Sequence, residues 1–197
     1  MSLWSLLDGG ISHPSPANNW RLRFVYWCGR RLASRHKNVT VPKSCRIHPG
    51  ARINPRNGAI RFGENCIVAD GAIIQGLVEF GENCSVQPYS ILTGYGTPEE
   101  PSGKITIGNH VRIASHGMFI ATNHNFDDPG KPICKQGLSS APITIEDDVW
   151  IAGRVNITAG VTIGQGSVIG GGSVVTKTIP PMSVAVGAPA RVIRTRG

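Results

Sequence analysis

The sequence predicts an all-β fold, a parallel β-helix in which the chain winds through short strands and tight turns. Two observations carry this prediction: an aliphatic residue recurs every six positions, and a GEN triplet returns eighteen residues later. The composition agrees, because 25 Gly and 14 Pro among 197 residues favour many turns over long helices. Self-similarity at a fixed period is the sequence signature of a solenoid.

The six-residue repeat is clearest from Ile143 onward, where the chain reads ITIEDD-VWIAGR-VNITAG-VTIGQG-SVIGGG-SVVTKT. Its aliphatic positions are Ile145, Ile151, Ile157, Ile163, Ile169 and Val175. The same register occurs earlier at Phe62, Val68, Ile74, Phe80, Val86, Leu92, Ile107 and Ile113. Three such hexads make one triangular coil of about eighteen residues, so equivalent side chains stack on successive coils and bury one another. The spacing alone leaves the handedness of the coil open.

Two polar stretches interrupt the repeat, residues 94–104 and the longer residues 123–142. A loop of about twenty residues that leaves a regular scaffold is usually functional or disordered. Before the repeat, residues 19–37 can form an amphipathic helix with Leu22, Val25, Tyr26 and Leu32 on one side. The predicted organisation is an N-terminal basic arm over residues 1–46, part of which can be helical, and a β-helix domain over residues 47–194.

The net charge of +8 belongs to the N-terminal arm. Residues 1–56 carry ten Lys or Arg and one acid, whereas residues 57–197 carry ten cations and eleven acids. A nucleic-acid-binding body would show a basic face of its own, so nucleic acid is not an expected partner. The cations of the arm, with Trp20 and Trp27, suit an anionic lipid surface; packing of the arm across the end of the β-helix is the other interpretation.

The cysteine pattern predicts free thiols. The five cysteines are scattered, form no CxxC pair, and two of them, Cys66 and Cys84, fall on the coil period as stacked core-edge residues. The first ten residues, MSLWSLLDGG, lack the basic start of a signal peptide, and no apolar run approaches the ~18 residues of a membrane span. We therefore expect a cytoplasmic protein, with peripheral contact at the inner face of the membrane as an option for the arm.

From Ile47 to Arg194 the chain resembles the hexapeptide-repeat acyltransferases of the maltose/galactoside O-acetyltransferase type, and their relatives in exopolysaccharide biosynthesis. The most specific part is ITIEDDVWIAGRVNITAGVTIGQGSVIGGGSVVTKTIPPMSVAVGAPARVIR. The resemblance implies that the parallel β-helix is left-handed and that three copies form a homotrimer with active sites between subunits. It also implies acetyl-CoA as cosubstrate, and no metal is expected.

The resemblance places the catalytic histidine at His124, in ATNHN, where the long loop leaves the β-helix. In this role a neutral imidazole accepts the proton of the acceptor hydroxyl as its oxygen attacks the thioester. Asn123 and Asn125, beside it, are predicted to contact the acceptor or to orient the His124 ring. Gln87, one coil earlier, where the family often has asparagine, is also predicted to contact the acceptor.

The resemblance also assigns the coenzyme side. Trp150 lines the cleft, and Gly153 and Gly171 allow the pantetheine arm to approach, although the family often has serine where Gly153 stands. The remaining predicted coenzyme residues are Thr176, Lys177, Arg191 and Arg194. Lysine and arginine suit the phosphates of CoA because phosphate is a multi-acceptor anion.

The predicted function is acetyl-CoA-dependent O-acetyl transfer to a sugar or polysaccharide-precursor hydroxyl. Within the same class, an N-acyltransferase acting on an aminosugar would use the same coenzyme edge. A zinc lyase of the γ-carbonic-anhydrase type needs three converging histidines, and His110, His116 and His124 are spaced poorly for that. A non-catalytic β-helix used for assembly is the third alternative, because fold does not imply function.

Overall fold

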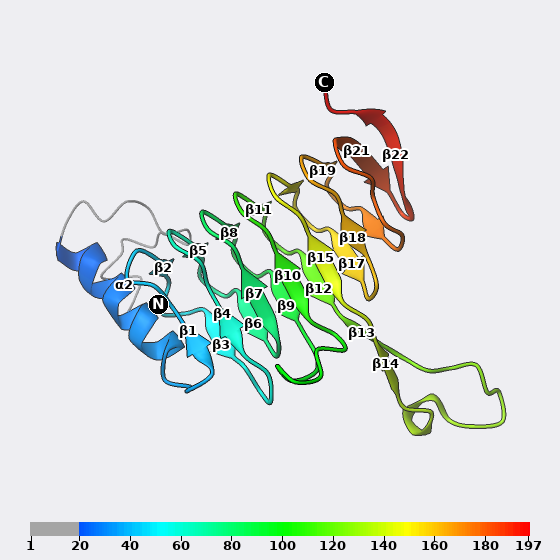
Figure 1. Cartoon of the computed structure of the whole chain (residues 1–197), viewed down its shortest axis with the longest axis horizontal. Helices are drawn as coiled ribbons and strands as arrows, with labels where there is room; N and C mark the ends of the chain where they lie inside the picture. The colour runs from blue at the N-terminus through cyan, green and yellow to red at the C-terminus, as the bar shows by residue number, and fades with distance from the viewer. Residues whose placement is uncertain (1–19) are drawn as a thin grey trace.

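The computed structural model describes residues 20–197, which form a β-helix with one helix across its N-terminal end (Figure 1). Three sheets make the walls of the coil, and they are parallel except for the last pair of strands in one of them. Each turn of the chain places one short strand in each wall, in the order sheet 1, sheet 2, sheet 3. The all-β prediction and the left-handed parallel β-helix are confirmed.

Each wall of the β-helix is a stack of strands from successive coils. Sheet 1 consists of β1 (Val39–Thr40), β4 (Ile60–Arg61), β7 (Val78–Phe80), β10 (Ile105–Ile107), β15 (Ile143–Ile145) and β18 (Thr162–Ile163). Sheet 2 consists of β2 (Arg46–Ile47), β5 (Ile67–Val68), β8 (Ser85–Val86), β11 (Arg112–Ile113), β16 (Trp150–Ile151), β19 (Val168–Ile169), β21 (Ser183–Gly187) and β22 (Ala190–Thr195). Sheet 3 consists of β3 (Arg52–Asn54), β6 (Ile73–Gln75), β9 (Ile91–Thr93), β12 (Met118–Ile120), β17 (Asn156–Thr158) and β20 (Val174–Val175).

The core lies inside the triangle and is built by the six-residue repeat. In sheet 3, for example, Phe119 pairs in register with Leu92 on one side and Ile157 on the other, and all three side chains are buried. Every aliphatic position of the predicted repeat is buried in the same way. Strands of two or three residues suffice because each coil needs only one inward side chain per wall, and the next coil covers it.

The helix α2 (Trp20–Ala33) lies within the range predicted to be helical; Asn19, the first residue of that range, is outside the described residues. Leu22, Val25 and Tyr26 are buried as expected, but Leu32 is exposed. The residues that lie against the coil near the end of α2 are the small Gly29 and Ala33, which leave Leu32 at the edge of the buried face.

The boundary between arm and β-helix domain, placed after residue 46, stays a prediction. β1 already pairs with β4, and the first residue of β2 pairs with β5. The first coil therefore begins inside the segment that the sequence assigns to the arm, because Val39 fills the inward position above Ile60. No helix within residues 20–197 is long and apolar enough to cross a bilayer.

The long excursion is more regular than its sequence indicates. It leaves and rejoins the coil as an antiparallel hairpin of β13 (Thr122–His124) and β14 (Leu138–Ser140), with a short 3₁₀ helix (Ile133–Lys135) between them. Figure 1 shows this hairpin projecting from the side of the β-helix. The shorter excursion, residues 94–104, is closed by a bridge between Tyr95 and Gly103.

Three cysteines form a column along the coil: Cys45, Cys66 and Cys84 are free and buried. Each thiol contacts a backbone carbonyl one coil onward, as Cys84 Sγ does with Gly108 O at 2.9 Å. The hydrogen bond with Cys66, followed by burial, raises the pKa of Cys45, whereas the same neighbour lowers the pKa of Cys84. Because all three sulfurs are shielded from water, access rather than acidity controls their reactivity.

We therefore expect a thiol reagent to label native protein fast at Cys134, which is exposed, and slowly at Cys28, which is half-buried and whose pKa is raised by burial. Cys45, Cys66 and Cys84 should react only on unfolding. The measurement is the time course of mass-resolved labelling with and without denaturant. Cys134→Ser should remove the fast phase, and a fast phase that survives it would contradict the assignment.

Candidate functional site

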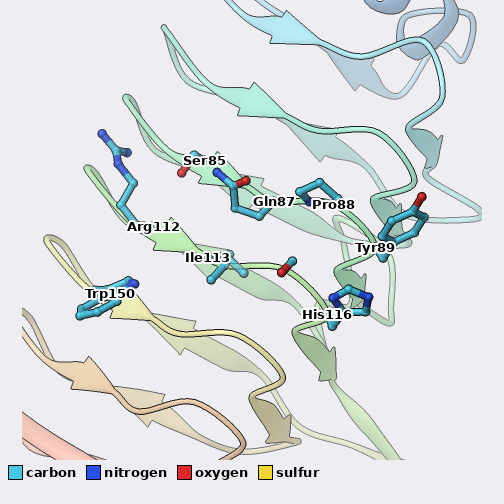
Figure 2. A pocket seen from close by; sticks show the side chains of 10 residues that line it. Ser85, Gln87, Pro88, Tyr89, Arg112, Ile113, His116 and Trp150 are labelled. Atoms are coloured by element: carbon cyan, nitrogen blue, oxygen red, sulfur yellow. The ribbon is translucent and has the colours of Figure 1, made fainter. Parts of the chain in front are cut away.

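A pocket of about 540 Å³ lies across β8, β11 and β16 on the outer face of sheet 2 (Figure 2). Gln87 and Trp150, both predicted site residues, line it from different coils. Arg112 stands beside Trp150 at one end, and its guanidinium donates to Asn83 O. An aromatic wall, an amide and a cation in one hollow suit a polar ligand with an apolar face.

The other end of the pocket is formed by two rings that the sequence did not single out as a pair. Tyr89 and His116 occupy the same turn on successive coils, each with a left-handed backbone (φ of 61°), and their ring centroids are 5.5 Å apart. A Cβ at Gly71, the equivalent position one coil earlier, would come within 2.5 Å of the Tyr89 ring. The missing side chain at residue 71 therefore leaves room for the ring.

The signal for this pair was present in the sequence. Gln87-Pro88-Tyr89 and Ala114-Ser115-His116 follow the paired residues Val86 and Ile113, so the two triplets are equivalent by register. The 94–104 excursion lies between them and hides the eighteen-residue spacing. The hexad register predicts only an outward position for His116, and the structure makes this residue part of the pocket wall.

Small residues lie next to the pocket at the corner between sheets 2 and 3. Ser115 lines the pocket, Arg154 N donates to Ser115 O at 3.0 Å, and Gly172 N donates to Gly153 O at 2.9 Å. A Cβ at Gly153 would lie 3.4 Å from Ser115 O, and one at Gly171 would lie 3.3 Å from Gly153 O. Because neither residue has a side chain, this corner presents backbone.

The predicted phosphate-binding cations lie at the C-terminal end. Lys177 follows β20, and Arg191 and Arg194 lie on β22; all three are exposed. Within residues 20–197 none of them forms a salt bridge with a carboxylate. Among the described residues, Arg191 and Arg194 donate only to the carbonyls of their neighbours in sequence, Ala190 and Thr195. These cations are therefore available to an anionic ligand.

His124 is the last residue of β13, at the root of the hairpin, and its side chain is exposed. It pairs with Leu138 across the hairpin. The sequence prediction that this histidine stands where the excursion leaves the coil agrees with the hairpin geometry. Its exposure leaves the imidazole accessible to a substrate or to a second copy of the chain.

The two asparagines that flank His124 differ in their contacts. Asn123 is exposed and pairs with Ser139 in the hairpin. Asn125 is committed to the loop: its Nδ2 donates to Gln136 O at 3.1 Å and its Oδ1 accepts from Ser139 Oγ at 2.6 Å. The Asn125 amide, predicted to contact the acceptor, thus holds the hairpin together. Gln136 does the same through hydrogen bonds with the backbone of Asp128 and Lys131.

The predicted site residues divide between two corners of the triangle. Trp150 lies on β16 in sheet 2 and lines the pocket, and Gly153 and Gly171 lie at the adjoining corner between sheets 2 and 3. His124, Thr176 and Lys177 lie at the corner between sheets 3 and 1, after β12 and β20. Sheet 3 separates the two groups, and His124 does not line the pocket. A single chain therefore does not bring His124 and the pocket together.

Metal-ligating side chains do not gather in the described part of the chain: no three His, Cys, Asp or Glu residues within it are placed to hold one ion. His110, His116 and His124 fall after β10, after β11 and in β13, at three different places around the coil.

Comparison with known proteins identifies the repeat independently. Residues 142–177 match the family model described as bacterial transferase hexapeptide (six repeats). Over 91 residues the chain is 50% identical to galactoside O-acetyltransferase of Escherichia coli, covering 46% of this chain and 43% of that one. It is 37% identical over 92 residues to a probable acetyltransferase of Mycobacterium tuberculosis, covering 47% and 31% respectively. The chain therefore spans less than half the length of these relatives.

Among solved structures, AntD from Bacillus cereus, an N-acyltransferase in complex with dTDP and 3-hydroxybutyryl-CoA, superimposes with a TM-score of 0.70. The match covers 80% of this chain and 82% of that one at 24% sequence identity, which supports the fold alone. The resemblance predicted from the sequence is thus confirmed: the chain is a hexapeptide-repeat β-helix protein similar to the acyltransferases built on this scaffold.

Proposed function

We propose that this protein is an acetyl-CoA-dependent O-acetyltransferase that acts on a hydroxyl of a sugar or polysaccharide precursor. The observation that carries the proposal is the pocket lined by Gln87 and Trp150, with the side-chain-free positions Gly153 and Gly171 at the adjoining corner. The pocket suits a polar, ring-shaped acceptor, and a corner without side chains suits the narrow arm of a thioester. The similarity to a galactoside O-acetyltransferase favours oxygen over nitrogen as the acylated atom.

In the proposed reaction, His124 accepts the proton of the acceptor hydroxyl while that oxygen attacks the thioester carbonyl carbon. The new C–O ester bond forms, the C–S bond breaks, and the sulfur of CoA leaves with a proton supplied by His124. The imidazole therefore returns to its neutral form in each cycle. No covalent acyl-enzyme is required, because holding both substrates in one cleft already supplies much of the rate advantage.

The reaction needs a second copy of the chain, since His124 and the pocket lie on opposite edges of sheet 3. An outward column of apolar side chains runs along that sheet between them: Ile73 pairs with Ile91, and Ile91 pairs with Met118. Burying this column against another copy would remove apolar surface from water and set His124 of one copy beside the pocket of the next. A closed ring of three copies, as the resemblance implies, places one such site at each interface.

Acylation of an aminosugar nitrogen is the second candidate within the same chemistry. The fold is shared with an N-acyltransferase, and Gln87 and Tyr89 could receive either acceptor. The protonation state of the acceptor distinguishes them, because an ammonium must lose a proton before it attacks whereas a hydroxyl loses it during attack.

The cytoplasmic location expected from the sequence stays a prediction.

The test is release of free CoA from acetyl-CoA by the purified chain, with a panel of sugars, oligosaccharides and aminosugars. We expect release to be stimulated by a hydroxyl acceptor, and the mass of the product should rise by one acetyl group. The bond type follows from alkaline hydroxylamine, which cleaves an ester and spares an amide. Stimulation only by aminosugars with an amide product would replace O-transfer by N-transfer. Failure to bind acetyl-CoA in calorimetry would overturn both.

The exposed C-terminal cations give a separate prediction. Lys177→Ala combined with Arg191→Ala should raise KM for acetyl-CoA by about tenfold or more, because a hydrogen bond to a charged group contributes about 1.5–3 kcal/mol. With acetyl-pantetheine, which lacks the nucleotide phosphates, variant and wild type should react alike. Arg61→Ala, an exposed cation on β4, is the matched control. An unchanged KM for acetyl-CoA would remove these residues from the coenzyme site.

A further inference from the structure

The helix α2 has a second apolar face that the coil does not use. Its buried face, with Val25, Gly29 and Ala33, lies on β2 and β3. A Cβ at Gly29 would fall 1.8 Å from Ile47 O, so the helix backbone lies directly on β2. This close contact fixes α2 across the N-terminal end of the β-helix, as Figure 1 shows, and turns its opposite face outward.

The outward face carries three large aromatic side chains. Trp20, Phe24 and Trp27 are spaced i, i+4 and i+7, which places them in one stripe opposite the buried face. Their exposed fractions are 70%, 46% and 48%. Phe24 and Trp27 stack with ring centroids 5.9 Å apart, and the Arg31 guanidinium lies 5.5 Å from the Trp27 ring. An ordered aromatic stripe of this size marks an interaction surface rather than ordinary scattered exposure.

The charge around the stripe has one sign. Residues 20–63 contain eleven Lys or Arg and no Asp or Glu. Beside the stripe, between α2 and the chain leading into β2, is a cavity of about 520 Å³ whose cationic lining residues are Arg23, Arg30, Lys43 and Arg46. Phe24 and Trp27 of the stripe also line this cavity. An apolar strip and an anion-binding hollow are therefore adjacent and share side chains.

The polar contacts of the cavity leave part of this charge uncompensated. Arg30 Nη1 donates to Cys45 O at 3.0 Å, and Arg46 Nε is buried without a hydrogen-bond partner among the described residues. Ser44, which lines the cavity, donates its hydroxyl to the carboxylate of Glu64. A buried N–H without an acceptor is costly, and an anionic oxygen in the cavity could supply one.

We propose that α2 docks the protein on an anionic lipid bilayer, with Trp20, Phe24 and Trp27 in the interfacial region and lipid phosphates at the cationic cavity. Indole rings flanked by guanidinium groups suit the headgroup level of a bilayer, where one part of the side chain is apolar and another is wet. A second copy of the chain is a poor partner for this surface, because its own cations would face the cations around α2. The helix lies on the membrane rather than across it.

The experiment is flotation of the full-length chain with vesicles of phosphatidylcholine alone and of phosphatidylcholine mixed with phosphatidylglycerol. We expect retention on the mixed vesicles, little on the neutral ones, and release as salt is raised. Arg23→Gln with Lys43→Gln should weaken partition about thirtyfold, as expected for two cations at an anionic surface. Lys131→Gln with Lys135→Gln, which removes the same charge from the exposed hairpin, is the matched control.

The aromatic stripe is tested by Trp20→Ser, Phe24→Ser and Trp27→Ser together, which should abolish retention while leaving the melting temperature unchanged because all three side chains are exposed. Retention of this variant at the wild-type level would overturn the proposal. The cations alone would then account for binding, and they would bind any acidic polymer in the same way. No binding of wild type to mixed vesicles would also overturn it, as would equal binding to neutral vesicles. The assay contains no acetyl-CoA, so its outcome is independent of the proposed acetyl transfer.

Discussion

Replacing His124 with alanine is expected to lower kcat for acetyl transfer by a factor of about 10²–10⁴, the usual contribution of a general base. The side chain is exposed at the root of the hairpin, so its loss should leave the fold and acetyl-CoA binding unchanged. Without an imidazole the acceptor hydroxyl must lose its proton to water during attack. The measurements are steady-state CoA release and calorimetric binding of acetyl-CoA to the same preparation.

His110 offers a control for this substitution. It lies in the turn between β10 and β11, outside the pocket, with a left-handed backbone (φ of 59°). Asparagine tolerates that conformation better than alanine does, so His110→Asn is the cleaner variant. It should retain wild-type turnover. If His124→Ala also kept wild-type turnover, another group would have to accept the proton, and His116 in the pocket wall would be the next candidate.

Phe119→Ala is expected to lower the free energy of unfolding by about 3–5 kcal/mol, the usual cost of truncating a buried aromatic side chain. Phe119 is fully buried in β12, between Leu92 and Ile157 of the neighbouring coils. A solenoid coil contacts only its neighbours, so no distant segment can fill the hole. Denaturant unfolding at fixed protein concentration measures the loss, because assembly makes apparent stability depend on concentration.

Phe126→Ala is the matched substitution outside the core. Phe126 is 68% exposed in the hairpin loop, so its removal should change stability by no more than about 0.5 kcal/mol. Equal losses for the two variants would mean that the hairpin, rather than the coil, limits unfolding. A small loss for Phe119→Ala alone would mean that the coil relaxes around the missing ring.

The sequence predicted the coil well because one physical rule repeats. Every hexad needs an inward aliphatic side chain, and residues such as Ile145 and Val86 meet this same requirement in different coils. An error in assigning one hexad therefore does not shift the assignment of the next. The resemblance named the corner glycines and the C-terminal cations, and their roles stay predictions. The structure shows Gly153 and Gly171 in turns after β16 and β19, and Lys177, Arg191 and Arg194 exposed.

Features that depend on contacts outside the repeat could not be predicted in this way. The commitment of Asn125 to the hairpin depends on Ser139 and Gln136, which are brought back by the pairing of β13 with β14. The facing rings of Tyr89 and His116 depend on how an intervening excursion is looped out. The second apolar face of α2 was visible as a pattern, but only the contact of Gly29 with β2 shows which face is free.

The hairpin leaves and rejoins the coil at nearly one point, since Ala141 N donates to Ala121 O at 3.2 Å. Closing such an appendage imposes almost nothing on the coils above and below it. β12, which precedes the hairpin, pairs with β9 and β17, and β15, which follows it, pairs with β10 and β18, so both strands keep their places in the stacked sheets. Natural variation can therefore lengthen, shorten or exchange this segment while the scaffold keeps its register. Under the proposed function, exchanging this segment would change the surroundings of His124 without disturbing the coils.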